Sequence, residues 1–185
     1  MITIQEKYKK QAVPALKEKF GYKNDLAAPK IVKVVVNSGF GRLISGKTGD
    51  DLKKTQEAIL NDLSLITGQR PVLTKAKQSI AGFKLREGSV VGAMVTLRGK
   101  KMYDFLQRLI GVGFPRSRDF RGIDPKAVDK SGNLTVAFKE HIVFPEIMPE
   151  QIKMIFGFEV TIATSSKTRE EGMELLRLIG FPIKK

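Results

Sequence analysis

The chain has 185 residues, 42% of them hydrophobic, with 33 Lys or Arg against 19 Asp or Glu and a formal net charge of +14. It holds no cysteine and one histidine, His141, which excludes disulfides and thiolate metal sites and leaves no ligand set for zinc. No apolar run approaches the roughly 20 residues that a membrane span requires. We therefore expect one soluble, cytoplasmic domain over residues 1–185, with no cofactor and with nucleic acid as its partner in preference to a membrane.

The first predicted elements are a broken helix, a strand and a second helix. Thr3 and Glu6 have the spacing of a capping box, which predicts a helix start, and Pro14 must kink or restart that helix. Residues 31–37 (IVKVVVN) are nearly all β-branched, which predicts a central strand. Residues 50–67 have the period of a helix. Its apolar stripe is assigned to the core: Leu52, Ile59, Leu63 and Ile66.

Residues 41–48 (GRLISGKT) match the phosphate-binding pattern GxxxxGK[ST] between a predicted strand and a predicted helix. Asp50 and Asp51 would place two carboxylates where the phosphates must lie. The later strands also look hairpin-linked, whereas the nucleotide-binding fold needs parallel strands joined by crossover helices. A nucleotide-binding P-loop over residues 41–48 is therefore kept only as the alternative function. No catalytic residue is assigned.

Residues 68–101 carry the most one-sided charge of the chain, with eight Lys or Arg and one acid, Glu87, for a net charge of +7. Two β-branched runs, 71–75 and 90–97, predict paired strands. The segment between them is polar, cationic and rich in small residues, which suits a loop directed toward an anionic partner. Because such charge is typical of phosphate neutralisation, the segment predicts a polyanion-binding hairpin.

A helix predicted over residues 102–112 leads into a loop, residues 113–122 (GFPRSRDFRG), that interleaves three arginines with two phenylalanines. Guanidinium planes and aromatic rings can stack on unpaired bases, so this loop is a second candidate RNA contact. An alternative interpretation, given equal weight, is a structural loop whose aromatic rings fill the core.

The last third of the chain predicts strands at both ends of an irregular region. The predicted elements are strands at 134–138 and 142–144, a short helix at 149–156, a strand at 158–164 and a helix at 170–179 that begins with a second capping pattern, Thr168 and Glu171. Gly172 lies inside that last helix, where it costs about 1 kcal/mol relative to Ala without an evident functional reason. Paired strands with helices between them predict an α+β fold with a mainly antiparallel sheet.

Several short motifs follow one another from about residue 13 to residue 182. They are 13–16 (VPAL), 19–24 (KFGYKN), 65–69 (LITGQ), 74–77 (TKAK), 79–88 (SIAGFKLREG), 95–99 (VTLRG), 118–122 (RDFRG), 144–147 (FPEI), 167–168 (KT) and 178–182 (LIGFP). In this order they resemble the fifth protein of the large ribosomal subunit, a universal family that binds 5S ribosomal RNA.

The resemblance implies a single α+β domain whose mainly antiparallel sheet has helices packed on one face and an RNA-binding surface on the other. It implies a structural constituent of the large subunit that binds 5S rRNA and large-subunit rRNA, helps form the central protuberance and is a monomer within the ribosome. The loop matching residues 74–85 is expected to reach the peptidyl-site tRNA. A small-subunit head protein is the expected partner in a bridge, to which the resemblance assigns no residues here.

The resemblance also assigns candidate RNA contacts by motif. Asn37 and Thr96 are polar groups expected to bond RNA sugars, bases or phosphates. Arg42 stands where the family usually has an acid and adds a candidate phosphate contact. The complete set of RNA-binding candidates is Asn37, Arg42, Arg70, Thr74, Lys75, Lys77, Gln78, Ser79, Lys84, Arg86, Thr96, Arg98, Arg116, Arg118 and Arg121. A general binder of nucleic acid or anionic membranes remains the other alternative.

Overall fold

A five-stranded antiparallel sheet lies at the centre of the protein, with strand order β2-β3-β1-β5-β4. The computed structural model describes residues 2–83, 85–118, 120–148, 150 and 152–184. The strands are β1 (Ile31–Gly39), β2 (Val72–Lys75), β3 (Val90–Leu97), β4 (Leu134–Phe138) and β5 (Phe158–Thr164). The expected α+β class with an antiparallel sheet and a central first strand is confirmed.

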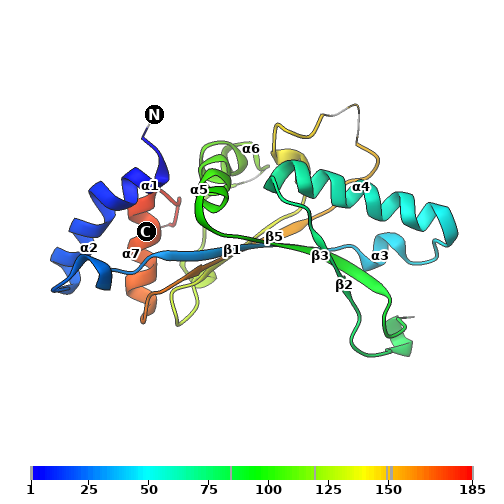
Figure 1. Ribbon diagram of the computed structural model, residues 1–185, viewed down its shortest axis with the longest axis horizontal. Helices are drawn as coiled ribbons and strands as arrows, with labels where there is room; N and C mark the ends of the chain where they lie inside the picture. The colour runs from blue at the N-terminus through cyan, green and yellow to red at the C-terminus, as the bar shows by residue number, and fades with distance from the viewer. Residues whose placement is uncertain (1, 84, 119, 149, 151, 185) are drawn as a thin grey trace.

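The helices gather on one side of the sheet and at one of its ends. Helices α4, α5 and α6 lie above the sheet in Figure 1, while α1, α2 and α7 pack together at its left end. Their bounds are α1 (Ile4–Lys7), α2 (Val13–Phe20), α3 (Gly41–Ile44), α4 (Gly49–Thr67), α5 (Gly99–Arg108), α6 (Phe114–Arg116) and α7 (Arg169–Ile179). The predicted stripe of α4 is in the core, with Ile59, Leu63 and Ile66 fully buried.

Alternation along the strands gives the sheet one buried and one open face. Val34 of β1 pairs with Ile162 of β5, and Val36 pairs with Val160; all four are fully buried on the helix side. Their neighbour Asn37 points the other way and is exposed. Successive side chains of a strand point to opposite faces of the sheet. One set of alternate side chains is therefore buried in the core, and the other set is left uncovered.

Two prolines interrupt helices in the same manner. The capping box of Thr3 and Glu6 is present, with both of its hydrogen bonds, and begins α1 as predicted. A π-helical turn, Tyr8–Ala12, then leads into α2 just before Pro14. A second π-helical turn, Leu109–Gly113, precedes Pro115 in the same way. Since proline lacks an amide hydrogen and its ring crowds the preceding turn, the wider turn accommodates it without ending the helix.

Two predicted elements between β4 and β5 are wrong. The predicted strand at 142–144 is instead a 3-10 turn, His141–Val143, and residues 152–156 of the predicted helix are irregular; residues 149 and 151 lie outside the described part of the chain. Apolar side chains of this segment enter the core without a ladder partner, because β4 already ends the sheet. Tertiary contacts hold it instead: the His141 ring stacks on Phe156 at 4.0 Å.

Gly172 has a packing role that its helical position does not reveal. Helix α7 lies directly against the turn at Gly132, so that a Cβ added at 172 would be 2.5 Å from the Gly132 carbonyl oxygen. A Cβ added at 132 would lie 2.9 Å from the Gly172 Cα. Neither position has room for a side chain, which explains a glycine that weakens the helix.

We predict that Gly172→Ala lowers the free energy of unfolding by about 1–3 kcal/mol, because overpacking outweighs the gain of about 1 kcal/mol in helix propensity. Urea denaturation measures the change. Gly111→Ala is the matched control, since a Cβ at 111 meets nothing within 4 Å. Equal stabilisation by both substitutions would show that the contact between α7 and the Gly132 turn is not tight.

Candidate nucleic-acid interface

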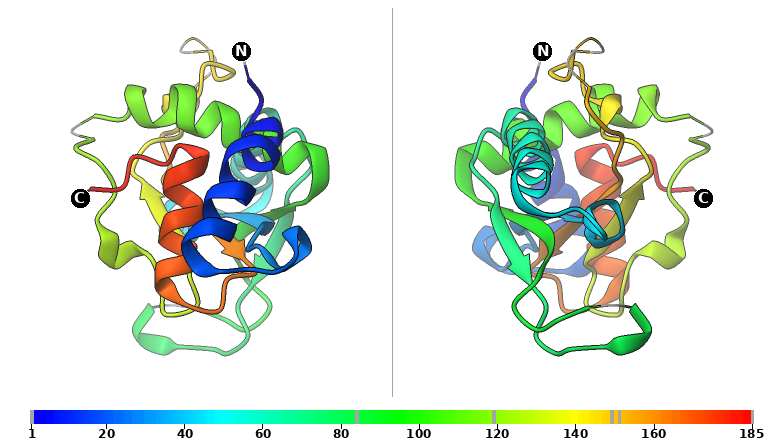
Figure 2. Two further views of the ribbon diagram at one scale, coloured as in Figure 1. Left: turned by 90° about the vertical axis from the view of Figure 1, so that its left-hand side faces the viewer. Right: turned by 90° about the vertical axis from the view of Figure 1, so that its right-hand side faces the viewer.

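The β2–β3 hairpin continues beyond the sheet as an extended arm, residues 76–89. Ala76 donates to the Ser89 carbonyl at 2.8 Å, and nearer the tip Ile80 and Leu85 exchange two backbone hydrogen bonds of 2.9 and 3.1 Å. The arm projects past the sheet on the side away from α4 and α5 (Figure 1), and both end-on views in Figure 2 show it as the lowest part of the molecule. Because backbone hydrogen bonds join its two sides, the described part of the hairpin arm, residues 76–83 and 85–89, is an ordered projection.

The predicted cations of the hairpin are presented to solvent. The exposed candidates are Lys75, Lys77, Gln78, Ser79 and Arg86, whereas Thr74 is half-buried at the root. Lys84 lies outside the described residues. Within the described part of the chain no carboxylate lies within 4.0 Å of Lys75, Lys77 or Arg86. Their charges are therefore available to an external anion. The Ser79 hydroxyl also supports the arm, because it accepts a hydrogen bond from the Glu87 amide at 2.9 Å.

A β-bulge at Val91 forms the root of the arm. Thr74 pairs with Gly92 but Lys75 pairs with Val90, so Val91 is the extra residue. Its carbonyl accepts a hydrogen bond from the Phe40 amide at 3.1 Å, which ties the bulge to the end of β1. Bulges increase twist and redirect a strand. This one accompanies the change in direction by which the arm leaves the sheet.

The uncovered side of the sheet, here called the open face, collects polar side chains from several strands. Register places Val72, Met94, Asn37, Glu159 and Ala137 in one row across the face. The next row holds Thr96, Val35, Thr161 and Thr135. Asn37 and Thr96, assigned separately from motifs far apart in sequence, therefore lie on one surface in adjacent rows. Asn37 is exposed and Thr96 is half-buried.

The open face is almost free of charge. The five strands contain two cations, Lys33 and Lys75, and a single acid, Glu159. Hydroxyl and amide groups dominate, and these suit sugars and base edges better than phosphates. Sequence reasoning missed Glu159, although a lone acid in otherwise acid-free strands is a signal that could have identified it.

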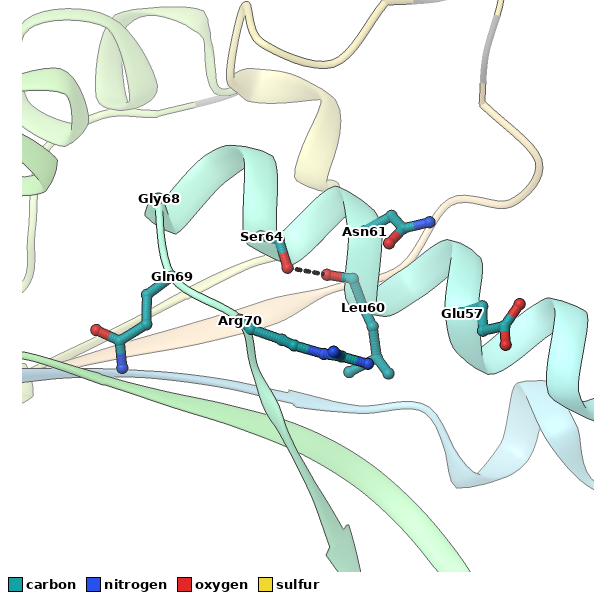
Figure 3. A pocket seen from close by; sticks show the side chains of 7 residues that line it. All are labelled: Glu57, Leu60, Asn61, Ser64, Gly68, Gln69 and Arg70. Atoms are coloured by element: carbon teal, nitrogen blue, oxygen red, sulfur yellow. Dashed lines mark hydrogen bonds between the residues drawn. The ribbon is translucent and has the colours of Figure 1, made fainter.

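Arg42, Arg70 and Arg98 lie just outside the five strands. Arg98 follows β3 with an extended backbone, two residues after Thr96, so its side chain leaves on the open-face side. Arg42 is exposed on α3, and Arg98 is the exposed N-cap residue of α5. Arg70 extends along α4 toward Leu60 (Figure 3). It helps line a groove of about 580 Å³ together with Glu57, Leu60, Asn61, Ser64, Gly68 and Gln69. The three arginines are therefore available to flanking RNA, each at a different margin.

The loop at 113–122 divides into a buried and an exposed set. Phe114 is buried and stacks on Phe120 with ring centroids 4.8 Å apart, and it also contacts Phe138 and Phe181. Phe114 therefore fills the core, as the structural alternative expected, and its stacking on RNA bases is excluded, whereas Phe120 is half-buried and lines the adjoining groove.

The arginines of this loop remain at the surface. Arg116, Arg118 and Arg121 are exposed and line a groove of about 750 Å³ that also receives Lys139 and Lys184. Arg118 lies 4.0 Å from the Glu140 carboxylate. The two lysines come from distant parts of the sequence, so only the fold shows that they extend this second basic surface. It lies beside β4, at the opposite edge of the sheet from β2.

The segment that resembles a P-loop does not form a phosphate cradle. The Lys47 amine donates to the Thr55 hydroxyl at 2.8 Å and lies 3.8 Å from Asp51. Helix α4 begins only at Gly49, with Asp50 and Asp51 in its first turn. Lys47 is thus turned onto its own helix, and the sheet is antiparallel throughout. The geometry opposes the nucleotide-binding alternative.

His141 has a structural environment. It is fully buried, its Nε2 lies 3.5 Å from Asp62 of α4, and its Nδ1 accepts from the Phe156 amide at 3.5 Å. No three His, Asp or Glu of the described residues are grouped so as to hold a metal ion. No helix in that part of the chain has the length and apolar character to cross a membrane.

Comparison with known proteins identifies the family of the chain. The family model described as Ribosomal protein L5 matches residues 24–86, and the model of the C-terminus of the same ribosomal family matches residues 90–183. The chain is 53% identical to the large ribosomal subunit protein uL5 of Desulforapulum autotrophicum, over 100% of this chain and 99% of the relative. The proteins of the same name from Halothermothrix orenii and Desulfotalea psychrophila are 48% and 49% identical, over 98% and 100% of both chains. The resemblance carried by the ordered motifs is confirmed, and the chain belongs to the L5 family of large-subunit ribosomal proteins.

Proposed function

We propose that the chain binds 5S ribosomal RNA through the open face of its sheet. The observation that carries the proposal is the meeting of Asn37 and Thr96 on one uncovered, nearly uncharged surface. RNA presents 2′-hydroxyls and base edges, which amide and hydroxyl groups can bond without a cation. The cations of the hairpin arm and of the groove beside β4 stand at the two edges of that surface, where they would neutralise the phosphates of the same RNA.

Membership of a ribosomal protein family makes the chain a ribosome-associated, cytoplasmic and non-enzymatic component of the large subunit. Beyond that, we propose that it acts as one RNA-binding domain over residues 1–185. The pairing of β1 with both β3 and β5 supports this extent, since it joins the segments matched by the two family models in a single sheet. On this proposal the chain is a monomer within the ribosome and helps form the central protuberance.

The hairpin arm is the proposed contact with peptidyl-site tRNA, through residues 74–85. The arm extends away from the helices, and its exposed cations would reach an anion that does not touch the sheet. Large-subunit rRNA would meet the remaining cations at the sheet margins. A small-subunit head protein would complete a bridge, for which the structure offers no assigned residue.

We predict that Asn37→Ala and Thr96→Val each weaken binding to 5S rRNA by roughly 5- to 15-fold, because each removes a hydrogen bond worth about 1–1.5 kcal/mol. Filter binding with the full chain measures the change. Thr48→Val, whose hydroxyl makes no capping hydrogen bond, is the matched control and should bind normally. Unchanged affinity in both open-face variants would remove the sheet from the interface.

Lys75→Ala combined with Lys77→Ala is expected to weaken peptidyl-site tRNA binding to ribosomes carrying the variant, while affinity for isolated 5S rRNA stays within about 3-fold of wild type. The reason is that the arm projects beyond the open face. Lys9→Ala with Lys10→Ala, at exposed positions before α2, is the charge-matched control. Equal loss of both activities would show that the arm and the sheet contact the same RNA.

The affinity for 5S rRNA should fall steeply between about 50 and 200 mM salt, since phosphate contacts release counterions. Competition with duplex DNA and with acidic lipid vesicles distinguishes a defined target from a general anion binder. We expect 5S rRNA to be retained against both competitors. Displacement by equal masses of DNA or vesicles would favour the general binder, and affinity that is independent of salt would contradict the role of the cations.

A further inference from the structure

We infer that Glu159 and Asn37 form a base-reading site on the open face, built to hold the Watson–Crick edge of an unpaired guanine. The inference rests on the proposed function, because it names the chemical group that the same face recognises. It concerns a residue that neither the charge pattern nor the motifs identified.

The first observation is that Glu159 is an acid on a surface proposed to contact a polyanion. It is exposed on the open face, in the row between Asn37 and Ala137, and it is the sole carboxylate in the five strands. No Lys or Arg lies within 4.0 Å of it among the described residues. An unpaired carboxylate here would repel phosphates, so a passive role would weaken RNA binding.

The second observation is the position of its neighbour. Asn37 of β1 is directly opposite Glu159 of β5 in the antiparallel register. Side chains in such pairs have Cβ atoms about 4.5–5.5 Å apart, within the width of one base edge. Neither the Asn37 amide nor the second carboxylate oxygen, Oε2, takes part in a hydrogen bond with the described residues. Both groups are exposed and available to a ligand.

The third observation is that neighbouring hydroxyl groups restrain the orientation of the Glu159 carboxylate. The Thr161 hydroxyl donates to Glu159 Oε1 at 3.3 Å, and the Thr135 hydroxyl lies 3.3 Å from the Thr161 hydroxyl on the next strand. This short chain of hydroxyls restrains the side chain along the face. A restrained acceptor loses less conformational entropy on binding than a freely rotating one.

The hydrogen-bonding groups of Glu159 and Asn37 indicate which base the pair would bind. A carboxylate only accepts hydrogen bonds, and guanine is the one standard base that presents two adjacent donors, N1–H and N2–H, on its Watson–Crick edge. The neighbouring guanine O6 is an acceptor and would take an N–H from the Asn37 amide. Adenine and cytosine offer one donor group beside an acceptor, and uracil offers one donor between two acceptors. The pair therefore discriminates in favour of guanine.

The surface beside the pair suits the plane of a base. Met94 is directly opposite Asn37 on its other side, and Val72 is opposite Met94; they are 39% and 68% exposed. Exposed apolar side chains can pack against the flat face of a base. Their place in the row lets them cover the flat face of the guanine or of its neighbour while the polar pair binds the edge. Only an unpaired nucleotide leaves that edge free.

The test uses the full chain and a 5S rRNA transcript. Glu159→Gln keeps the shape but removes the charge and one acceptor, so we expect affinity to fall roughly 5- to 150-fold. The slope of log affinity against log salt concentration should not change, since no phosphate contact is lost. Glu18→Gln, an exposed carboxylate on α2, is the matched control and should bind as the wild type does. Circular dichroism melting checks that both variants are folded.

A kethoxal probe, which reacts with guanine N1 and N2, then identifies the base. We expect the wild-type chain to protect a guanine that Glu159→Gln leaves reactive. Inosine at that one position lacks the N2 amine and should weaken binding of the wild type but not of Glu159→Gln. Equal or tighter binding by Glu159→Gln, no protected guanine, or additive effects of the two changes would overturn the inference. Failure of the wild type to bind 5S rRNA would instead overturn the proposed function.

Discussion

The structure depends on the pairing of β1 with β3 on one side and with β5 on the other. This register directs Val34 and Val36 into the core and Asn37 to the opposite face. A slip of one residue would exchange the two faces of every strand, burying amides and exposing valines. Burial of the apolar row is therefore what holds the polar row in place. The helices stabilise the open face without touching it.

The fold separates two kinds of polar surface in space. Cations stand on the hairpin arm and beside β4, where their attraction extends over about 8–10 Å at physiological salt. The sheet between them has few charges, and its hydrogen-bonding groups act only at contact. On the proposed function, a polyanion would be attracted by the cations at the margins and would form hydrogen bonds with the strands between them. The bulge at Val91 lies where the arm leaves the sheet, so the cations of the arm and the hydrogen-bonding groups of the open face occupy separate surfaces.

Local patterns predicted most regular elements because local physics decides them. The strands β3, β4 and β5 have the predicted bounds, since β-branched runs end at turn residues, and the N-cap hydroxyls of Thr3 and Thr168 begin α1 and α7. The failed strand at 142–144 was equally apolar. It lacks a partner because β4 is the last strand of the sheet, a fact that no local window contains. The apparent P-loop failed for a related reason, since eight matching residues do not determine where Lys47 points.

Composition, periodicity and ordered motifs are properties of the chain, so the α+β class, the concentration of positive charge in the hairpin and the family could be inferred without a structure. Folding was needed to show that Asn37 and Thr96 share a face and that Lys139 and Lys184 join the arginines of residues 116–121. It alone placed Glu159 beside Asn37 and Gly172 against Gly132. The physical reason is that these are contacts between segments far apart in sequence, and such contacts are set by strand register and by packing over the whole core.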